Sequence, residues 1–111
     1  MAGRAEIASA TIASTAPRVV ELAAPEVTPN PTHGGSTISF ILAGSGTAEV
    51  SVFDLGGRAV RTLASASFSA GRHTLAWDGR TATGERALPG VYFCEIRTDH
   101  VVSVKRIVLV P

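Results

Sequence analysis

From residue 36 to the end of the chain, apolar side chains alternate with polar ones in short runs. The clearest run is 36–42 (STISFIL), in which Ile38, Phe40 and Leu42 lie on one face and the polar Thr37 and Ser39 on the other. A period of two residues is typical of a strand with one buried face. The same pattern predicts further strands at 48–54, 59–63, 72–77, 91–98 and 101–110.

Turn residues separate these runs at the spacing expected of a β-sandwich. Paired glycines supply the positive φ that a tight hairpin requires, and such a turn is predicted at Asp54, Gly56, Gly57 and Arg58. Because no helical pattern follows residue 28, two sheets must cover each other. We therefore predict an all-β chain, an immunoglobulin-like β-sandwich of about seven antiparallel strands. Periodicity alone leaves the strand order open.

Residues 1–28 lack the pattern of a folded domain. Polar residues interrupt any apolar run long enough for a secretory signal peptide. We expect a flexible linker or the tail of an upstream cargo domain, with a weak edge strand at 18–23; the alanines also allow a short helix. Three prolines between residues 25 and 31 keep the next stretch extended. The sandwich is accordingly expected to occupy 29–111.

The last predicted strand, 101–110, is apolar on both faces. Its four even-numbered valines share one face, and Ile107 and Leu109 share the other. An exposed edge strand of this composition is prone to aggregation. Three arrangements resolve the conflict: a bulge near Lys105 and Arg106 that exchanges the faces, insertion between covered neighbours, or a partner that covers the strand.

Composition excludes several functional classes. Apolar residues make up 45% of the 111 and charged residues 17%, which is typical of a globular chain. A net charge of +1 provides no basic surface for nucleic acid. The single cysteine, Cys94, excludes an internal disulfide and a cysteine-based zinc site. It shares its face with Tyr92 and Ile96, so we expect a buried, unreactive thiol.

Candidate catalytic and ligand-binding residues are few. The three histidines, His33 among them, are not at the spacing of metal ligands. Asp78 precedes a glycine and an arginine and lacks the alternating carboxylates of a calcium loop, so we expect it to cap amides of its own loop. Trp77 shares the face of the inward residues, which favours core packing over sugar binding. The sequence therefore predicts no catalytic site, metal or cofactor.

The order of the short motifs resembles that of a known family. Residues 29–111 resemble the C-terminal sorting domain of type IX secretion substrates, in the form that overlaps the Ig-like domain of flagellar hook-capping (FlgD-type) proteins. The motifs are Pro29-Asn30-Pro31, the hairpin Asp54, Gly56, Gly57 and Arg58, the loop start Trp77-Asp78-Gly79, the strand start Gly90 and Tyr92, and the end Lys105, Arg106, Ile107, Val108, Leu109 and Val110.

This resemblance implies a non-catalytic module that targets a secreted cargo protein for outer-membrane translocation and surface attachment. The implied partners are the outer-membrane secretion and attachment machinery and the covalently linked cargo. The first and last motifs are implied to carry recognition, and the other motifs to form structural turns. The implied location is secreted or at the cell surface. Since no signal peptide is recognisable, we expect a fragment of a larger precursor.

Two other functions remain open on the sequence. A structural Ig-like spacer or assembly domain of a surface or hook-capping protein has the same strand pattern. A carbohydrate- or protein-binding accessory module requires an exposed aromatic platform, for which Trp77 and Tyr92 are the candidates.

Overall fold

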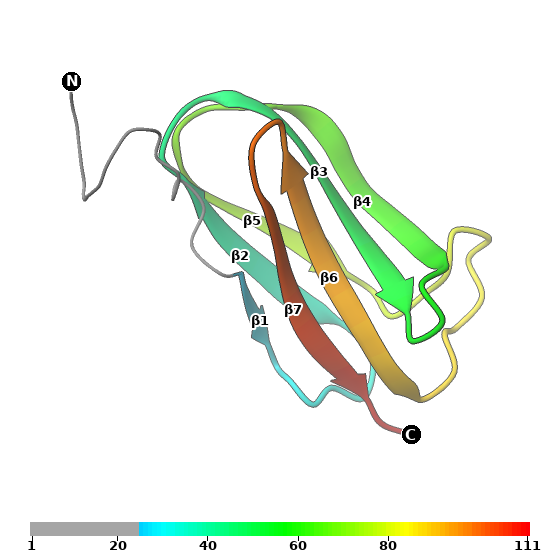
Figure 1. The fold of residues 1–111 in the computed structure, drawn as a ribbon. Helices are drawn as coiled ribbons and strands as arrows, with labels where there is room; N and C mark the ends of the chain where they lie inside the picture. Colours follow the sequence, from blue (N-terminus) through cyan, green and yellow to red (C-terminus); the bar gives the residue numbers. More distant parts are fainter. Residues whose placement is uncertain (1–24) are drawn as a thin grey trace.

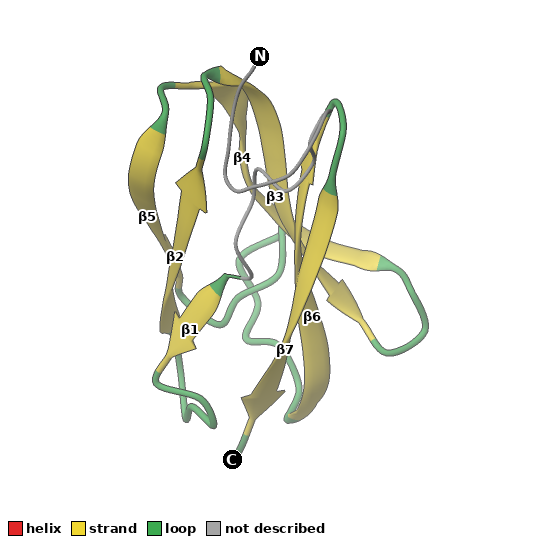
Figure 2. Ribbon diagram, turned by 60° about the vertical axis from the view of Figure 1, so that its left-hand side comes forward, coloured by secondary structure: helices red, strands yellow, loops and turns green. Residues whose placement is uncertain are grey.

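Antiparallel strands without any helix build residues 25–111, the part of the chain that the computed structural model describes (Figures 1 and 2). Nothing in this part therefore meets the length and apolarity of a membrane-spanning helix. The strands are β1 (Glu26–Thr28), β2 (Ser36–Leu42), β3 (Gly46–Asp54), β4 (Ala59–Phe68), β5 (Gly71–Trp77), β6 (Gly90–Thr98) and β7 (Val102–Leu109).

The strands form two packed sheets, as Figure 2 shows from the side. One sheet has the order β1-β2-β5 and the other the order β4-β3-β6-β7. In a constant-type immunoglobulin domain the fourth strand joins the sheet of the first, second and fifth strands. Here β4 pairs with β3 instead, along most of its length. The prediction of an immunoglobulin-like sandwich is confirmed, and the structure adds the strand order.

The inward face of each strand supplies the core between the sheets. In β2 the residues predicted to face inward, Ile38, Phe40 and Leu42, are 0 to 5% exposed. Trp77 and Tyr92 pack edge to face with ring centroids 5.5 Å apart. Burial of such side chains contributes about 1.5–3 kcal/mol each, which is the main stabilising term of the fold. The buried cluster comprises Val27, Ile38, Phe40, Leu42, Val50, Val52, Trp77, Tyr92, Cys94, Ile96, Ile107 and Leu109.

Strand β4 is longer than the sequence predicts. It was expected to end at residue 63, but it continues to Phe68. Residues 64–68 (ASASF) alternate mainly between alanine and serine, and alanine has little preference for strands. They stay extended because they pair with β3 from Gly46 to Val50. The register of β4 against β3 shifts just before this second half, between the β3 residues Ser51 and Val50. Non-local pairing with β3 therefore determines the strand.

The N-terminal part of the sandwich begins before residue 29. Strand β1 pairs antiparallel with β2, and Val27 lies in the core at 7% exposure. Residues 26–28, which the sequence analysis assigned to the linker, thus form an edge strand of the three-stranded sheet. Their fragment EVT is too short to show an alternating pattern. The weak strand expected at 18–23 lies outside the described residues.

Strand β7 contains no bulge. Its pairing with β6 runs in one register from Val102 to Leu109, so the first of the three arrangements, a bulge near Lys105 and Arg106, is wrong. Insertion between two strands is also wrong, because β7 is the last strand of its sheet. The two apolar faces differ instead in exposure: Ile107 on the inner face is buried, whereas valines of the outer face are exposed.

Candidate functional site

The edge of β7 is divided into a covered and an open part. Around its end, Thr32 pairs with β7 as a short parallel bridge: the Thr32 N–H donates to the Val108 carbonyl (2.9 Å), and the Val110 N–H donates to the Thr32 carbonyl (2.8 Å). From Val102 to Val104 no residue of the described chain forms a comparable bond on this side. Within residues 25–111, the start of β7 therefore presents a strand edge without a partner.

Asn30 marks the boundary between the two parts. Its side-chain amide donates from Nδ2 to the Arg106 carbonyl (2.7 Å), and its Oδ1 accepts from the Val108 N–H (2.9 Å). One side chain thus makes the pair of bonds that a peptide group of a neighbouring strand makes. Only Asn or Gln carries donor and acceptor in this arrangement.

His33 continues the contact between the two ends of the domain. Its Nδ1 lies 2.8 Å from the backbone oxygen of Pro111. Since a carbonyl oxygen only accepts, Nδ1–H is the donor. The backbone oxygen of His33 in turn lies 3.4 Å from Nη2 of Arg86, which comes from the loop before β6. The segment after β1 is therefore fixed to the end of β7, as Figure 1 shows.

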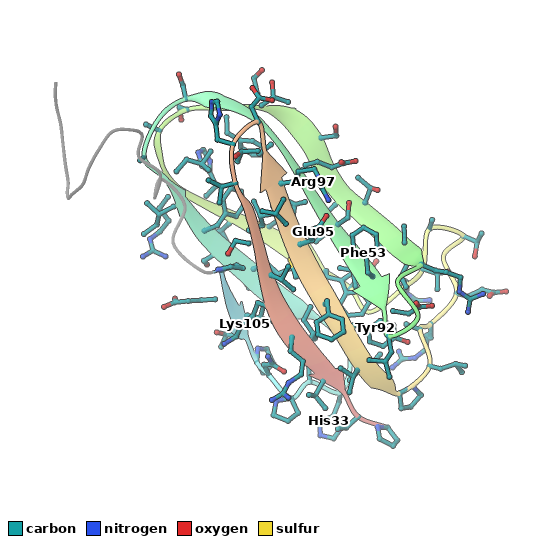
Figure 3. The ribbon with its side chains drawn as sticks, in the orientation of Figure 1. His33, Phe53, Tyr92, Glu95, Arg97 and Lys105 are labelled. Atoms are coloured by element: carbon teal, nitrogen blue, oxygen red, sulfur yellow. The ribbon has the colours of Figure 1, made fainter. Side chains whose placement is uncertain are left out.

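The outer face of the β7 sheet carries an apolar strip next to this edge. Phe53, Phe93 and Arg106 lie in one cross-strand row, because Phe53 pairs with Phe93 and Phe93 with Arg106. Val104 is 50% exposed and lines two shallow hollows together with Phe93. One hollow reaches Pro31 and the other reaches the turn after β3. Figure 3 shows Phe53 on this face, beside Glu95 and Arg97.

The charges around the strip are mostly positive. Glu95 forms an ion pair with Arg97 at 3.2 Å. Lys105 and Arg106 are exposed, and within residues 25–111 neither has an acidic partner in ion-pair distance. They lie on opposite faces of β7, so the open edge carries a cation on each face.

The hairpin after β3 is the turn that the sequence predicts. The Asp54 carboxylate accepts the Arg58 N–H (2.9 Å), and Gly57 has a φ of 86°. The bond from the Arg58 backbone, followed by the charge of the Arg58 guanidinium, holds the pKa of Asp54 below its usual value. Asp54 and Gly57 line the second hollow, so this turn borders the apolar strip.

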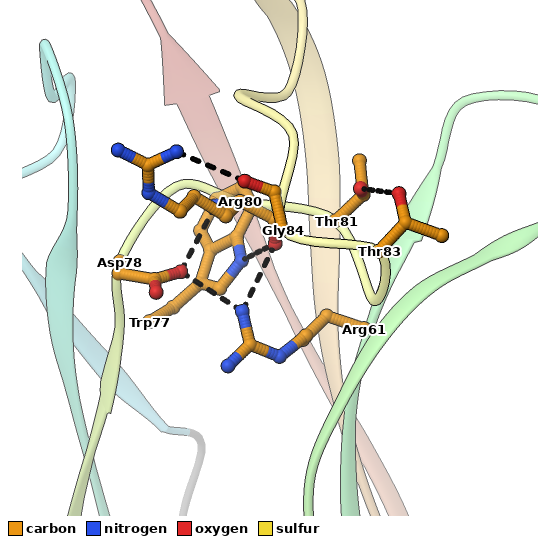
Figure 4. Close-up of polar contacts among 7 residues, drawn as sticks. All are labelled: Arg61, Trp77, Asp78, Arg80, Thr81, Thr83 and Gly84. Carbon is orange, nitrogen blue, oxygen red and sulfur yellow. Dashed lines mark hydrogen bonds and ion pairs between the residues drawn. The ribbon is translucent and has the colours of Figure 1, made fainter.

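The loop after β5 forms a separate cluster of hydrogen bonds and ion pairs (Figure 4). Asp78 Oδ1 accepts the Arg80 N–H (3.0 Å), which confirms the expected cap, and it also accepts Nη1 of Arg61 from β4 (2.9 Å). The Trp77 indole N–H donates to the Arg80 carbonyl (2.9 Å). Desolvation opposes ionisation of Asp78, but the Arg80 amide and the Arg61 charge together lower its pKa. These contacts join the loop after β5 to strand β4.

Strand β6 holds its polar groups in structural contacts. It starts at Gly90, and the hydroxyl of Tyr92 donates to the Leu88 carbonyl (2.6 Å), like the tyrosine corner of immunoglobulin-like domains. Burial, with the nearby charge of Asp54, raises the pKa of Tyr92. Burial raises the pKa of the Cys94 thiol to about 12, so this thiol is protonated and inert at neutral pH. Among the described residues, no group of three or more His, Cys, Asp or Glu is placed to hold a metal ion.

The structure brings the two implied recognition motifs together, and Tyr92 of a third motif pairs with Asp54 on one side and with Ile107 on the other. Residues 29–31 contact the end of β7 although more than seventy positions separate them in the chain. Within the second motif, Ile107 and Leu109 are buried in the core. Its accessible part is formed by Lys105, Arg106 and the half-buried Val108 and Val110.

Sequence reasoning missed three features of this surface. The bridge formed by Thr32 depends on backbone atoms, which have no sequence signal. The role of His33 at Pro111 depends on folding across the whole domain. The exposed placement of Val104 and the half-exposed Phe93 follows from the position of β7 at the sheet edge, which periodicity does not give. Trp77 and Tyr92 are buried, which argues against an aromatic sugar platform built on them.

Comparison with known proteins identifies relatives of the fold. The family model described as FlgD Ig-like domain matches residues 25–100, more than half of the chain. Among curated proteins, none matches this sequence.

Two solved structures from Porphyromonas gingivalis are similar to the chain. Dimeric latent PorU matches with a TM-score of 0.70 and 17% identity over 88% of this chain and 10% of its own. PorZ, described as an essential bacterial surface component of the type IX secretion system, matches with a TM-score of 0.51 and 21% identity, over 78% of this chain and 11% of its own. The chain thus spans about a tenth of each of these proteins, and at these identities the likeness concerns the fold.

Proposed function

The chain belongs to the FlgD Ig-like domain family, and on this basis we propose that it is a C-terminal sorting module of a type IX secretion substrate. In this role it targets a covalently linked cargo protein for outer-membrane translocation and surface attachment. Its partners are the secretion and attachment machinery, and its location is secreted or at the cell surface. The resemblance of the motifs and the likeness to PorU and PorZ support the proposal.

The observation that carries the proposal is the joining of the two motifs into one surface. Asn30 and the β7 backbone hold the first motif against the last, so both ends of the domain form a single rigid feature. A receptor that recognises folded modules needs a fixed backbone edge and a few fixed side chains. The edge of β7 with Lys105 and Arg106 supplies both.

We propose a binding role without catalysis. The thiol of Cys94 is buried and protonated. The ring nitrogen of His33 that has a described partner donates to a backbone oxygen, so it is engaged in a structural bond. The chemistry of the exposed surface is that of apolar side chains, cations and unpaired peptide groups, which suits recognition.

The test attaches the full chain to a signal peptide and a reporter in a bacterium with a type IX secretion system. The fusion is expected on the cell surface, and deletion of residues 105–111 is expected to leave it in the periplasm. The double variant Lys105→Ala, Arg106→Ala, which keeps the core, is expected to reduce surface display. Arg72→Ala removes an exposed cation from β5 of the other sheet and serves as the control. Unchanged display of both altered forms contradicts the proposal.

A structural Ig-like spacer or assembly domain is the second candidate, and the family match favours it because residues 25–100 exclude β7. The two functions differ in what may follow the domain. A spacer tolerates another folded domain fused after Pro111, whereas a sorting module that presents its C-terminal strand loses export when its end is blocked. Measuring reporter display with such a fusion separates them.

A further inference from the structure

We propose that the open stretch of β7, residues 102–106, binds an extended acidic segment of a partner protein, which adds as a fifth strand to the four-stranded sheet. The inference deepens the proposed function and rests on it for the source of this segment, the secretion machinery. The binding itself is a property of the purified domain.

The first argument is the direction of the backbone groups. In an antiparallel pair the N–H and C=O of one residue point to the same side, and this side alternates along the strand. The Arg106 carbonyl and the N–H groups of Val108 and Val110 face the segment after β1. By the same alternation, the N–H and C=O of Val102 and Val104 point away from β6 and toward the open side. These groups can form backbone hydrogen bonds with an added strand.

The second argument is the length of the open edge. The Asn30 amide occupies the positions from the Arg106 carbonyl to the Val108 N–H, so an added strand must end there. The five residues from Val102 to Arg106 span about 13–17 Å at the rise of a β-strand. A short extended segment fits this edge, whereas a long strand meets Asn30 and Pro31.

The third argument is the side-chain surface beside the edge. Val102 is 47% exposed and Val104 50%, on the same face as Phe93. The hollow at Phe93, Val104 and Arg106 measures about 510 Å³ and opens toward this edge. An apolar side chain of the added strand would cover these valines, which residues 25–111 leave exposed.

The fourth argument is charge, which selects the occupant. Lys105 and Arg106 flank the open edge on both faces, and Glu95 on the neighbouring strand is engaged with Arg97. A second copy of the chain, paired antiparallel about Val104, would place four cations at the seam, Lys105 and Arg106 of each copy. Such like-charge contact is unfavourable. An acidic strand is complementary, so we assign the edge to that occupant.

The experiment titrates the full chain with an end-capped peptide of about seven residues in which valine alternates with glutamate, followed by NMR amide shifts. Saturable binding with shifts confined to β6, β7 and Asn30 is expected. A peptide with lysine at the glutamate positions is expected to bind at least about tenfold more weakly. With the valines over Val102 and Val104, the charged positions all lie on the face of Lys105, and lysine there repels it. N-methylation of the peptide amides that face β7 is expected to abolish binding, since it removes the strand pairing.

Variants of the domain locate the site. Val104→Pro removes an outward N–H at an edge position where proline is tolerated, so binding is expected to fall at least about tenfold while the fold persists. Val104→Thr keeps the N–H and is expected to bind within about twofold of the parent. The inference is overturned if Val104→Pro binds the glutamate peptide as tightly as the parent does, or if the lysine peptide binds as tightly as the glutamate peptide. It is also overturned if the amide shifts fall on the other sheet or if the chain forms a dimer through β7.

The result is separable from the proposed function. If the peptide fails to bind but the Lys105→Ala, Arg106→Ala fusion still fails to reach the surface, sorting stands and strand addition is wrong. If the peptide binds but the fusion is displayed normally, the edge is a binding site and the sorting role is wrong.

Discussion

At the scale of single residues, Gly79 shows why a short motif has its composition. Its φ is 77°, and a Cβ built on it would collide with the backbone oxygen of Gly34. Both the left-handed conformation and the close approach of two backbones exclude a side chain. This contact joins the loop after β5 to the segment before β2, so the glycine helps to hold the hydrogen-bond cluster around Asp78 in place.

Replacing Gly79 by alanine therefore tests two effects. The expected loss is at least ~2 kcal/mol of unfolding free energy, from the unfavourable φ and the displaced backbone, measured by urea denaturation. Gly84→Ala is the matched control: its φ is 91° but a Cβ there meets open space, so only ~1 kcal/mol is expected. Equal losses in the two variants contradict the steric account.

At the scale of elements, the segment after β1 and the end of β7 behave as one unit. Asn30 supplies the bonds of a peptide group to the backbone at Arg106 and Val108. Its neighbour Thr32 is 2% exposed and pairs with β7 through its backbone. The covered part of the edge strand thus depends on the Asn30 side chain together with the backbone of Thr32.

Asn30→Ala leaves the Val108 N–H without its partner and is expected to cost about 1–3 kcal/mol of unfolding free energy. Asn30→Asp keeps the acceptor and loses the donor, so the carboxylate faces the Arg106 carbonyl and the loss is expected to be comparable. Hydrogen exchange is the second measurement: the Val108 and Val110 amides should exchange faster in both variants. Exchange at β2 serves as the internal control, and unchanged rates at both β7 amides contradict the role of Asn30.

The elements also show what the sequence could predict. Strands β2, β5 and β6 follow from alternation alone, because each has one buried face. The second half of β4 and all of β1 could not be predicted, because pairing with a neighbour keeps them extended. For the site, the motif residues were identified, but their meeting at β7 is a tertiary contact. Nothing in the pattern of Asn30 alone points to the backbone of Arg106.

At the scale of the whole molecule, two carboxylates make the stability depend on pH. The pKa values of Asp54 and Asp78 are lowered in the folded state by backbone and arginine contacts. A group whose folded pKa is depressed contributes stability above its unfolded pKa and loses it as pH falls through the folded one. The stability of the domain is therefore expected to stay level above about pH 5 and to fall below about pH 4.

Thermal unfolding across this pH range, for the parent and for Asp78→Asn, checks the expectation. The variant has no titrating group at residue 78, so its midpoint is expected to fall less steeply with acid than that of the parent. Parallel curves for Asp78→Asn and the parent contradict the assignment.

The central claim also concerns the whole molecule: one folded β-sandwich acts as the sorting signal of a secreted protein. The most direct measurement is the accessibility to external protease of a signal peptide–reporter–domain fusion in paired strains with and without the type IX translocation machinery. The account predicts a reporter that protease digests in the intact strain and that stays protected in the strain lacking the machinery. Equal protection in both strains, or equal exposure in both, would contradict it.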